Sequence, residues 1–386
     1  MCYDSARMSS GRATAHRWMA IDQTRGAAMV LVWFSHFVVV YFPGSAYPPG
    51  ARAISIVTKA ASPTFVILSG ILLGWFTARD GPVADRIRLR FLDRGVFLLT
   101  VAHLVIWAAH IARAGSPARA ARVEFMTDTI GLCLIAGPLA VRRLSAPARV
   151  ATGLALLVGS WATLVLHHGD PPGGALGELV VGSLYPDDLD YTFPVLPWAG
   201  VFLASTAMGE RFHALRARGL DRVARVCWLT AAGLFASAAP TWLVHRAASG
   251  SPALWDLTRL GQKAPPGPGF IALFGGCAFA LLATFLELER RGWVGRAGRL
   301  LATIGRCSLF AFVAQYAVYY TALELLRPSL AGPSVLWLAA SIGLLAAATA
   351  AWDAMDGNRW LTVGILRPLP LRAPSPGPPD AAPGGP

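Results

Sequence analysis

Three polar side chains, His36, His103 and Gln315, occupy positions where a membrane-spanning helix would ordinarily carry apolar ones. His36 lies ten residues past Gly26, near the start of its apolar run, which is about 15 Å along a helix. His103 and Gln315 reach similar depths in two later apolar runs that enter from the same side. We therefore expect the three side chains to share one layer near the middle of the membrane.

These residue types suit proton transfer or acyl transfer. Histidine changes its charge near neutral pH, so it can take a proton from an acceptor or carry an acyl group transiently. Glutamine can orient a substrate but cannot take a proton. A structural interpretation competes with this one, because buried histidine and glutamine also link helices through hydrogen bonds. No metal site is expected, since neither the spacing of the histidines nor nearby carboxylates support one.

An acid and a base, Asp22 and Arg25, stand three residues apart at the start of the first apolar run. They could pair and anchor the helix at the membrane interface. Alternatively, Arg25 and the adjacent helix N-terminus could hold a phosphorylated cofactor.

A second polar feature is the acidic and aromatic stretch "YPDDLDYTFPVLPW" at residues 185–198, which contains Asp190 and Trp198. Acids and aromatic faces suit a sugar ring, whereas a solvated loop with its tryptophan at the membrane interface would explain the same residues.

The composition predicts an all-α polytopic membrane protein. Of 386 residues, 55% are hydrophobic and only 14% are charged, too few to cover a soluble protein of this length. The net charge of +13 comes almost wholly from arginine. Such charge decorates cytoplasmic loops in membrane proteins and requires no nucleic-acid partner. Long apolar runs predict about ten spans, near 26–42, 63–78, 95–112, 126–141, 149–167, 193–208, 226–245, 270–286, 303–321 and 332–352.

The loop charges predict the orientation. Alternate loops carry clusters of arginine, whereas the longest loop of the other set, 168–192, has acids and neither arginine nor lysine. This positive-inside pattern places both termini in the cytoplasm of a multi-pass protein of the plasma (inner) membrane. We expect a cytoplasmic tail at 1–16, a transmembrane domain at 17–365 and a disordered proline-rich tail at 366–386. The first run is also compatible with a cleaved signal peptide, but Ser35 and His36 interrupt it and no clean cleavage site follows.

Four segments together resemble the family of heparan-alpha-glucosaminide N-acetyltransferase. "RWMAIDQTRGAAMVLVWFSHF" is similar to the family's opening pattern, R-x-x-x-[IVL]-D-x-x-R-G-x-A, followed by an apolar span with a polar residue. "ASPTFVILSG" resembles its second span, "DYTFPVLPWAGVFLASTAMG" its D-x-x-P-L-L-P-W-x-G segment, and "GRCSLFAFVAQYAVYY" its late G-x-x-S-L-x-x-Y-x-x-H segment. The order and spacing agree from about residue 17 to residue 320.

The resemblance implies acyl transfer across the membrane, from a cytoplasmic acyl-CoA, in the first instance acetyl-CoA, to an extracytoplasmic sugar or envelope glycan. On this hypothesis Asp22 and Arg25 bind the cofactor, and His36 is the general base with His103 assisting it. The acceptor then meets Asp190, Trp198 and Gln315. The chain departs from the family's pattern, because residues 37–102 contain no histidine and Gln315 stands where many bacterial relatives have one.

Two other functions stay open at this point. One is a transporter or export partner without chemistry, and the other is a catalytically silent scaffold, which the missing late histidine favours. The expected partners are the lipid bilayer and the acceptor, and a homo-oligomer is compatible with the sequence.

Overall fold

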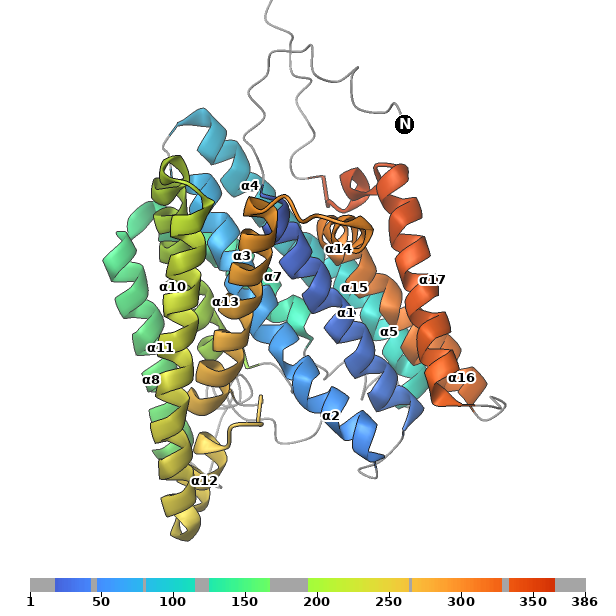
Figure 1. Ribbon diagram of the computed structural model, residues 1–386, viewed down its shortest axis with the longest axis horizontal. Coiled ribbons are helices and arrows are strands. Elements are labelled where there is room, and N and C mark those ends of the chain that lie inside the picture. Colours follow the sequence, from blue (N-terminus) through green and yellow to red (C-terminus); the bar gives the residue numbers. More distant parts are fainter. Residues whose placement is uncertain are drawn as a thin grey trace, which may run out of the picture.

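The computed structural model describes residues 18–42, 47–78, 81–114, 125–166, 194–263, 266–327 and 333–364, and these residues form a bundle of long helices (Figure 1). This confirms the expected all-α membrane architecture. The first half contains α1 (Met19–Tyr41), α2 (Pro49–Val57), α3 (Ala61–Thr77), α4 (Pro82–Phe97), α5 (His103–Ala114), α7 (Met126–Arg143) and α8 (Ala146–Leu166). The second half contains α10 (Val195–Leu215), α11 (Leu220–Ala247), α12 (Pro252–Thr258), α13 (Pro268–Arg290), α14 (Arg296–Arg306), α15 (Ser308–Tyr316), α16 (Glu324–Leu326) and α17 (Ser334–Ala354). Short 3-10 or π-helical turns extend or join them: η1 (Thr58–Ala60), η2 (Leu98–Ala102), η3 (Arg216–Arg218), η4 (Ala248–Gly250), η5 (Ala317–Leu323) and η7 (Gly357–Trp360).

Within the described ranges, eight helical segments are long and apolar enough to cross a membrane: Met19–Tyr41, Pro49–Thr77, Pro82–Ala109, Ala146–Leu166, Leu220–Gly250, Pro268–Arg290, Ser308–Leu326 and Ser334–Ala354. The chain is therefore a multi-pass membrane protein. The other two predicted spans correspond to α7 and α10, helices of 18 and 21 residues. They pack in the same bundle, α7 against α4 and α10 against α3 and α8. The count of ten spans stays a prediction.

Most arginines at the helix ends lie at one end of the bundle, at the top of Figure 1, which we call the arginine-rich end. Both ends of the described chain meet there. The backbone N–H of Ala20, at the start of α1, donates to the Glu289 carboxylate of α13 at 2.6 Å. Arg306 of α14 pairs with Asp353 of α17 at 2.7 Å. The arginines at the helix ends on this side are Arg86, Arg88, Arg90, Arg142, Arg143, Arg211, Arg216, Arg218, Arg222, Arg225, Arg290, Arg291, Arg296 and Arg299.

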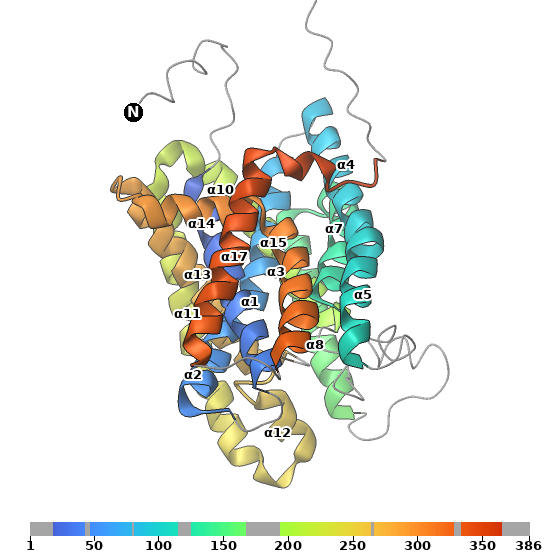
Figure 2. The same ribbon diagram turned by 90° about the vertical axis from the view of Figure 1, so that its right-hand side faces the viewer.

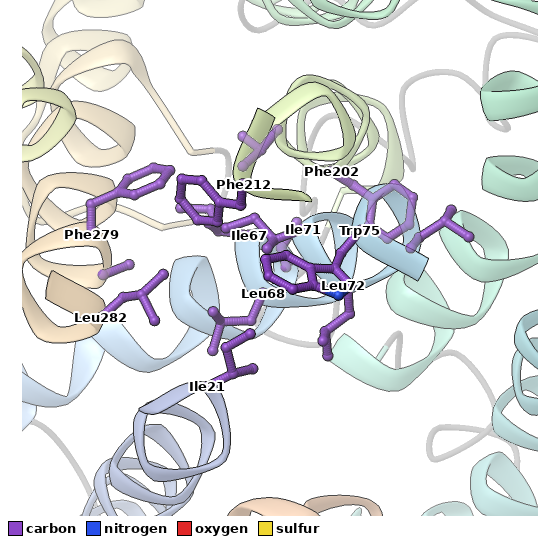
Figure 3. Packing of buried hydrophobic residues seen from close by; sticks show 14 of the residues in the cluster. Ile21, Ile67, Leu68, Ile71, Leu72, Trp75, Phe202, Phe212, Phe279 and Leu282 are labelled. Carbon is purple, nitrogen blue, oxygen red and sulfur yellow. The ribbon is translucent and has the colours of Figure 1, made fainter. Parts of the chain in front are cut away.

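Two buried clusters hold the bundle together. The first, which we call the aliphatic core, joins α3, α10, α11 and α13, with the start of α1 at its edge. Figure 3 shows Ile67, Ile71 and Trp75 of α3 reaching toward Phe202 and Phe212 of α10. Burial of apolar surface between helices gives this half close van der Waals packing.

The second cluster, which we call the aromatic core, joins the outer half of α1 to α15, η5 and α17. Its rings include Trp33 and Phe37 of α1 and three buried tyrosines, Tyr316, Tyr319 and Tyr320. Figure 2 shows α1, α15 and α17 side by side on this face of the molecule. The tyrosines bring hydroxyl groups into the interior, which distinguishes this cluster from the aliphatic core.

Small residues allow the helix α14, which lies across the arginine-rich end in Figure 1, to press against α1. A Cβ atom at Gly26 would overlap the Leu301 carbonyl, and one at Gly305 would overlap the Asp22 carbonyl. Backbones that approach this closely fix the direction of the first turns of α1. The Glu289 carboxylate, which accepts from Met19 and Ala20, also satisfies N–H groups that a helix start leaves without intrahelical partners.

Candidate active site

The candidate site is built around a pair formed by the partly buried side chains of His103 and Asp128. His103 opens α5, Asp128 lies in the first turn of α7, and the imidazole Nδ1 is 2.9 Å from the carboxylate Oδ1. The other oxygen, Oδ2, accepts the backbone N–H of Phe125 at 2.9 Å. Because the carboxylate is held from both sides, it fixes the imidazole with Nδ1 toward the acid and Nε2 turned away. This arrangement makes Nε2 the basic nitrogen.

His36 lies against the tyrosines of the aromatic core. Its ring is 5.4 Å from that of Tyr316 and 5.3 Å from that of Tyr320, both edge to face. Tyr316 is in turn 5.9 Å from Phe125, and Phe125 is 5.5 Å from His103. A continuous row of rings, which we call the aromatic bridge, therefore links the two histidines: His36, Tyr316, Phe125 and His103.

Two π-helical turns position the ends of this bridge. The turn η2 ends at Ala102, directly before His103, and η5 begins at Ala317, directly after Tyr316. A π turn adds a residue to the helical circuit and so rotates the following side chains relative to a regular α-helix. Such turns are rare and occur frequently at functional sites. The helix α5 packs directly against η5, so the two turns lie at one junction.

A cavity of about 90 Å³ lies against the first turn of α7, where Met126 and Thr127 line it. Room of this size holds several waters or a short acyl group, since one water needs roughly 10–15 Å³ by the same measure. The lining residues are Arg25, Phe65, Ser69, Arg94, Leu98, Met126, Thr127, Ile130, Leu134, Ser308, Leu309 and Phe312.

The cavity connects the arginine-rich half of the bundle to the start of α7. Arg25, in the second turn of α1, donates to the Ser308 hydroxyl at 2.6 Å. Arg94 of α4 contributes a second guanidinium to the lining. At the other end, Met126 and Thr127 directly precede Asp128 in α7. The guanidinium groups suit phosphate or another anion, and the apolar walls suit an acyl chain.

The predicted cofactor residues separate in the structure. Arg25 lines the cavity, whereas Asp22 is buried where α1 crosses α14 and interacts electrostatically with Arg306. Arg25 is thus the member of the pair placed to meet a ligand, and Asp22 lies at a helix contact.

The predicted acceptor residues also separate. Gln315 is fully buried in α15, on the helix face that carries Ser308 and Phe312 into the cavity, and the described residues give its amide no hydrogen-bond partner. Trp198 is fully buried in the aliphatic core, 6.2 Å from the Phe270 ring. Asp190 lies outside the described residues, as do the tails predicted at 1–16 and 366–386.

Four residues of this site were missed by the sequence reasoning: Asp128, Thr127, Tyr316 and Tyr320. Asp128 was detectable, because it is an acid within the predicted span 126–141 and the rule applied to the histidines covers it equally. Tyrosine and threonine carry no comparable signal, since both are ordinary in membrane helices. Arg94 belongs to the arginines at 79–94, which the sequence makes further candidates for holding a phosphorylated cofactor, although topology alone explains most of them.

Metal chemistry was not predicted, and the described part of the chain contains no group of three or more His, Cys, Asp or Glu side chains that could hold a metal ion.

Fold and site together define a helical membrane protein with a carboxylate-held histidine beside an arginine-lined cavity. The family model for "heparan-alpha-glucosaminide N-acetyltransferase, catalytic" matches residues 17–247, and the chain belongs to this family of membrane acetyltransferases. No curated protein sequence matches the chain. The matched range contains Arg25, His36, His103 and Asp128, whereas Gln315 and the tyrosines lie beyond it.

Proposed function

We propose that the protein transfers an acyl group, acetyl in the first instance, from cytoplasmic acyl-CoA to an amine or hydroxyl of a sugar on the other side of the plasma membrane. One observation carries this proposal: a single cavity is lined by Arg25 and Arg94 and by Met126 and Thr127, which precede the His103 partner Asp128 in α7. A donor bound by its phosphates near Arg25 and Arg94 would extend its acyl end along this cavity toward the histidine.

The chemistry follows from the orientation of the imidazole. Asp128 holds Nδ1, so Nε2 of His103 accepts the proton of the acceptor amine or hydroxyl as it attacks the thioester. The carboxylate also stabilises the imidazolium that forms. General-base assistance of this kind contributes typically about 10²–10⁴ in rate.

In this proposal the acceptor binds at the His36 end of the aromatic bridge. The tyrosine rings pack against it edge to face, and aromatic faces with hydroxyl groups suit a sugar ring. Gln315, with an unpartnered buried amide among the described residues, would give the acceptor two further hydrogen-bonding groups.

The direct test uses sealed vesicles that contain the purified protein, with labelled acetyl-CoA added on the arginine-rich side and glucosamine enclosed on the other. We expect labelled N-acetylglucosamine inside the vesicles and no transfer by protein-free vesicles. A panel of amino and hydroxyl sugars then defines the acceptor class. Transport of intact glucosamine without acetylation would instead support an export function.

A further inference from the structure

Thr127 lines the cavity and has a buried hydroxyl to which the described residues offer no hydrogen-bond partner. The residue is 4% exposed. Burying a hydroxyl without a partner costs free energy, so an unpaired one beside a cavity points to a ligand that completes it.

Other buried threonines show why Thr127 is different. Thr24, Thr64 and Thr349 each donate to the carbonyl four residues earlier in their helix, at 2.7 Å in every case. Thr127 is the second residue of α7, so no preceding turn of that helix supplies such a carbonyl. Its hydroxyl is therefore available to the cavity.

The backbone around Thr127 also favours a negative charge near its hydroxyl. The first turn of an α-helix carries a partial positive charge. In α7 the N–H groups of Asp128 and Thr129 already donate to the Phe125 carbonyl, at 2.9 Å and 3.4 Å, so this turn contributes through its dipole. The helix α7 has 18 residues, so its dipole is well developed. A negative charge that develops at the Thr127 hydroxyl meets this positive end in surroundings lined by Met126, Ile130 and Leu134, where electrostatic interactions are stronger than in water.

We propose that the Thr127 hydroxyl and the first turn of α7 form the oxyanion site for the acyl thioester. This inference rests on the proposed function. Thr127 directly precedes Asp128, so this oxyanion site lies in the same helical turn as the carboxylate that holds His103.

The acyl transfer consists of an attack on the thioester followed by the departure of CoA. The lone pair of the acceptor nitrogen or oxygen attacks the carbonyl carbon, and the carbonyl π electrons move onto the oxygen at Thr127. The acceptor proton passes to Nε2 of His103. When the C=O bond re-forms, the carbon–sulfur bond breaks, and CoA leaves as a thiolate that takes the proton from the His103 imidazolium.

The test compares Thr127→Val, which keeps the shape and removes the hydroxyl, with Thr127→Ser, which keeps the hydroxyl. We expect valine to lower kcat by roughly 10²–10³, the loss seen when one oxyanion donor is removed, with little change in KM for acetyl-CoA. Serine should stay near the wild-type kcat. Because valine removes an unsatisfied buried group, the thermal midpoint of Thr127→Val should be unchanged or higher.

Thr349→Val is the matched control, because it removes a buried hydroxyl that is already paired and lies in α17. This variant should lose some stability and keep the wild-type kcat. A loss of kcat in Thr127→Val that merely follows a lower folded fraction would overturn the inference, as would a wild-type kcat.

A binding arm separates this inference from the proposed function. Wild-type protein should bind acetyl-CoA more tightly than CoA, and Thr127→Val should reduce that difference. If the wild type transfers acetyl groups while Thr127→Val keeps both kcat and the binding difference, the oxyanion site alone is wrong. If the binding difference depends on Thr127 but no acceptor is acetylated, the proposed function alone is wrong.

Discussion

The aliphatic core and the aromatic core are built from the same kind of helix. They differ in the buried polar groups that the described residues leave without hydrogen-bond partners. In the aliphatic core, regular helices pack Ile71, Phe202 and Phe212 together, and little in the cluster other than the rims of its tryptophans can exchange hydrogen bonds (Figure 3). In the aromatic core, Tyr316 and Tyr320 lie beside His36, and the neighbouring Gln315 amide has no partner among the described residues.

The difference indicates that the aliphatic core serves as a scaffold and the aromatic core as a ligand site. Polar groups without partners are expensive inside a membrane, so a region that retains them and also interrupts a helix with the π turn η5 is shaped for a ligand. The aliphatic core supplies a scaffold that keeps the other region in place. Substitutions in the first region should therefore change stability, and substitutions in the second should change activity.

The largest effect is expected at Asp128. Asp128→Asn would keep the contact with His103 but favour the wrong tautomer of the ring, and turnover should fall by roughly 10²–10⁴. The matched control is Glu210→Gln, which weakens the contact between Glu210 and the buried Arg149 in the scaffold half. The control should lose stability yet keep its turnover per folded molecule, which steady-state kinetics and a thermal melt together would show. Equal losses of turnover in both variants would remove the distinction between the two regions.

A large effect on stability is expected in the aliphatic core. Phe202 is 2% exposed, and Phe202→Ala should lower the free energy of unfolding by about 3–5 kcal/mol through loss of packing. Denaturation in detergent micelles measures the change. A variant with wild-type stability but impaired turnover would show that this core takes part in the chemistry.

A smaller effect is expected at the arginine-rich end of the cavity. Arg25→Lys keeps the positive charge but loses the planar fork, so the affinity for acyl-CoA should fall by roughly tenfold, about 1.4 kcal/mol. Isothermal titration with acetyl-CoA gives the value, and Arg299→Lys, at an exposed position on α14, serves as the control. If lysine at position 25 restores wild-type affinity, Arg25 anchors the helix and does not grip a phosphate.

The smallest effect, and one opposite in sign to that of Phe202→Ala, is expected at Gln315. Replacing its unpartnered amide by the similarly sized side chain in Gln315→Met should raise the free energy of unfolding by about 1 kcal/mol. The same variant should raise KM for the acceptor and leave the binding of acetyl-CoA unchanged. A drop in stability would show that the amide already has a structural partner.

The sequence predicted the architecture well, because apolar runs and arginine clusters report directly on the cost of placing residues in lipid. Helical rise also predicted that His36 and His103 share one depth in the membrane; the structure links them through the aromatic bridge, and the shared depth stays a prediction. The partner of His103 required the structure, since Asp128 comes from another helix and its contact depends on the π turn before His103. The cavity was likewise beyond the sequence: Arg25, Thr127 and Ser308 come from three helices whose mutual packing no periodicity encodes.

The central claim, that His103 is the base of an acyl transfer, is tested most directly by the turnover of His103→Gln beside that of His36→Asn, both measured with labelled acetyl-CoA and a reactive amino sugar. We expect the turnover of His103→Gln to fall by at least roughly 100-fold in a folded, inserted protein. For His36→Asn we expect a loss of about tenfold or less, expressed mainly in KM for the acceptor. If His103→Gln keeps near-wild-type turnover while His36→Asn loses it, His103 is not the general base. The base is then His36, at the other end of the aromatic bridge.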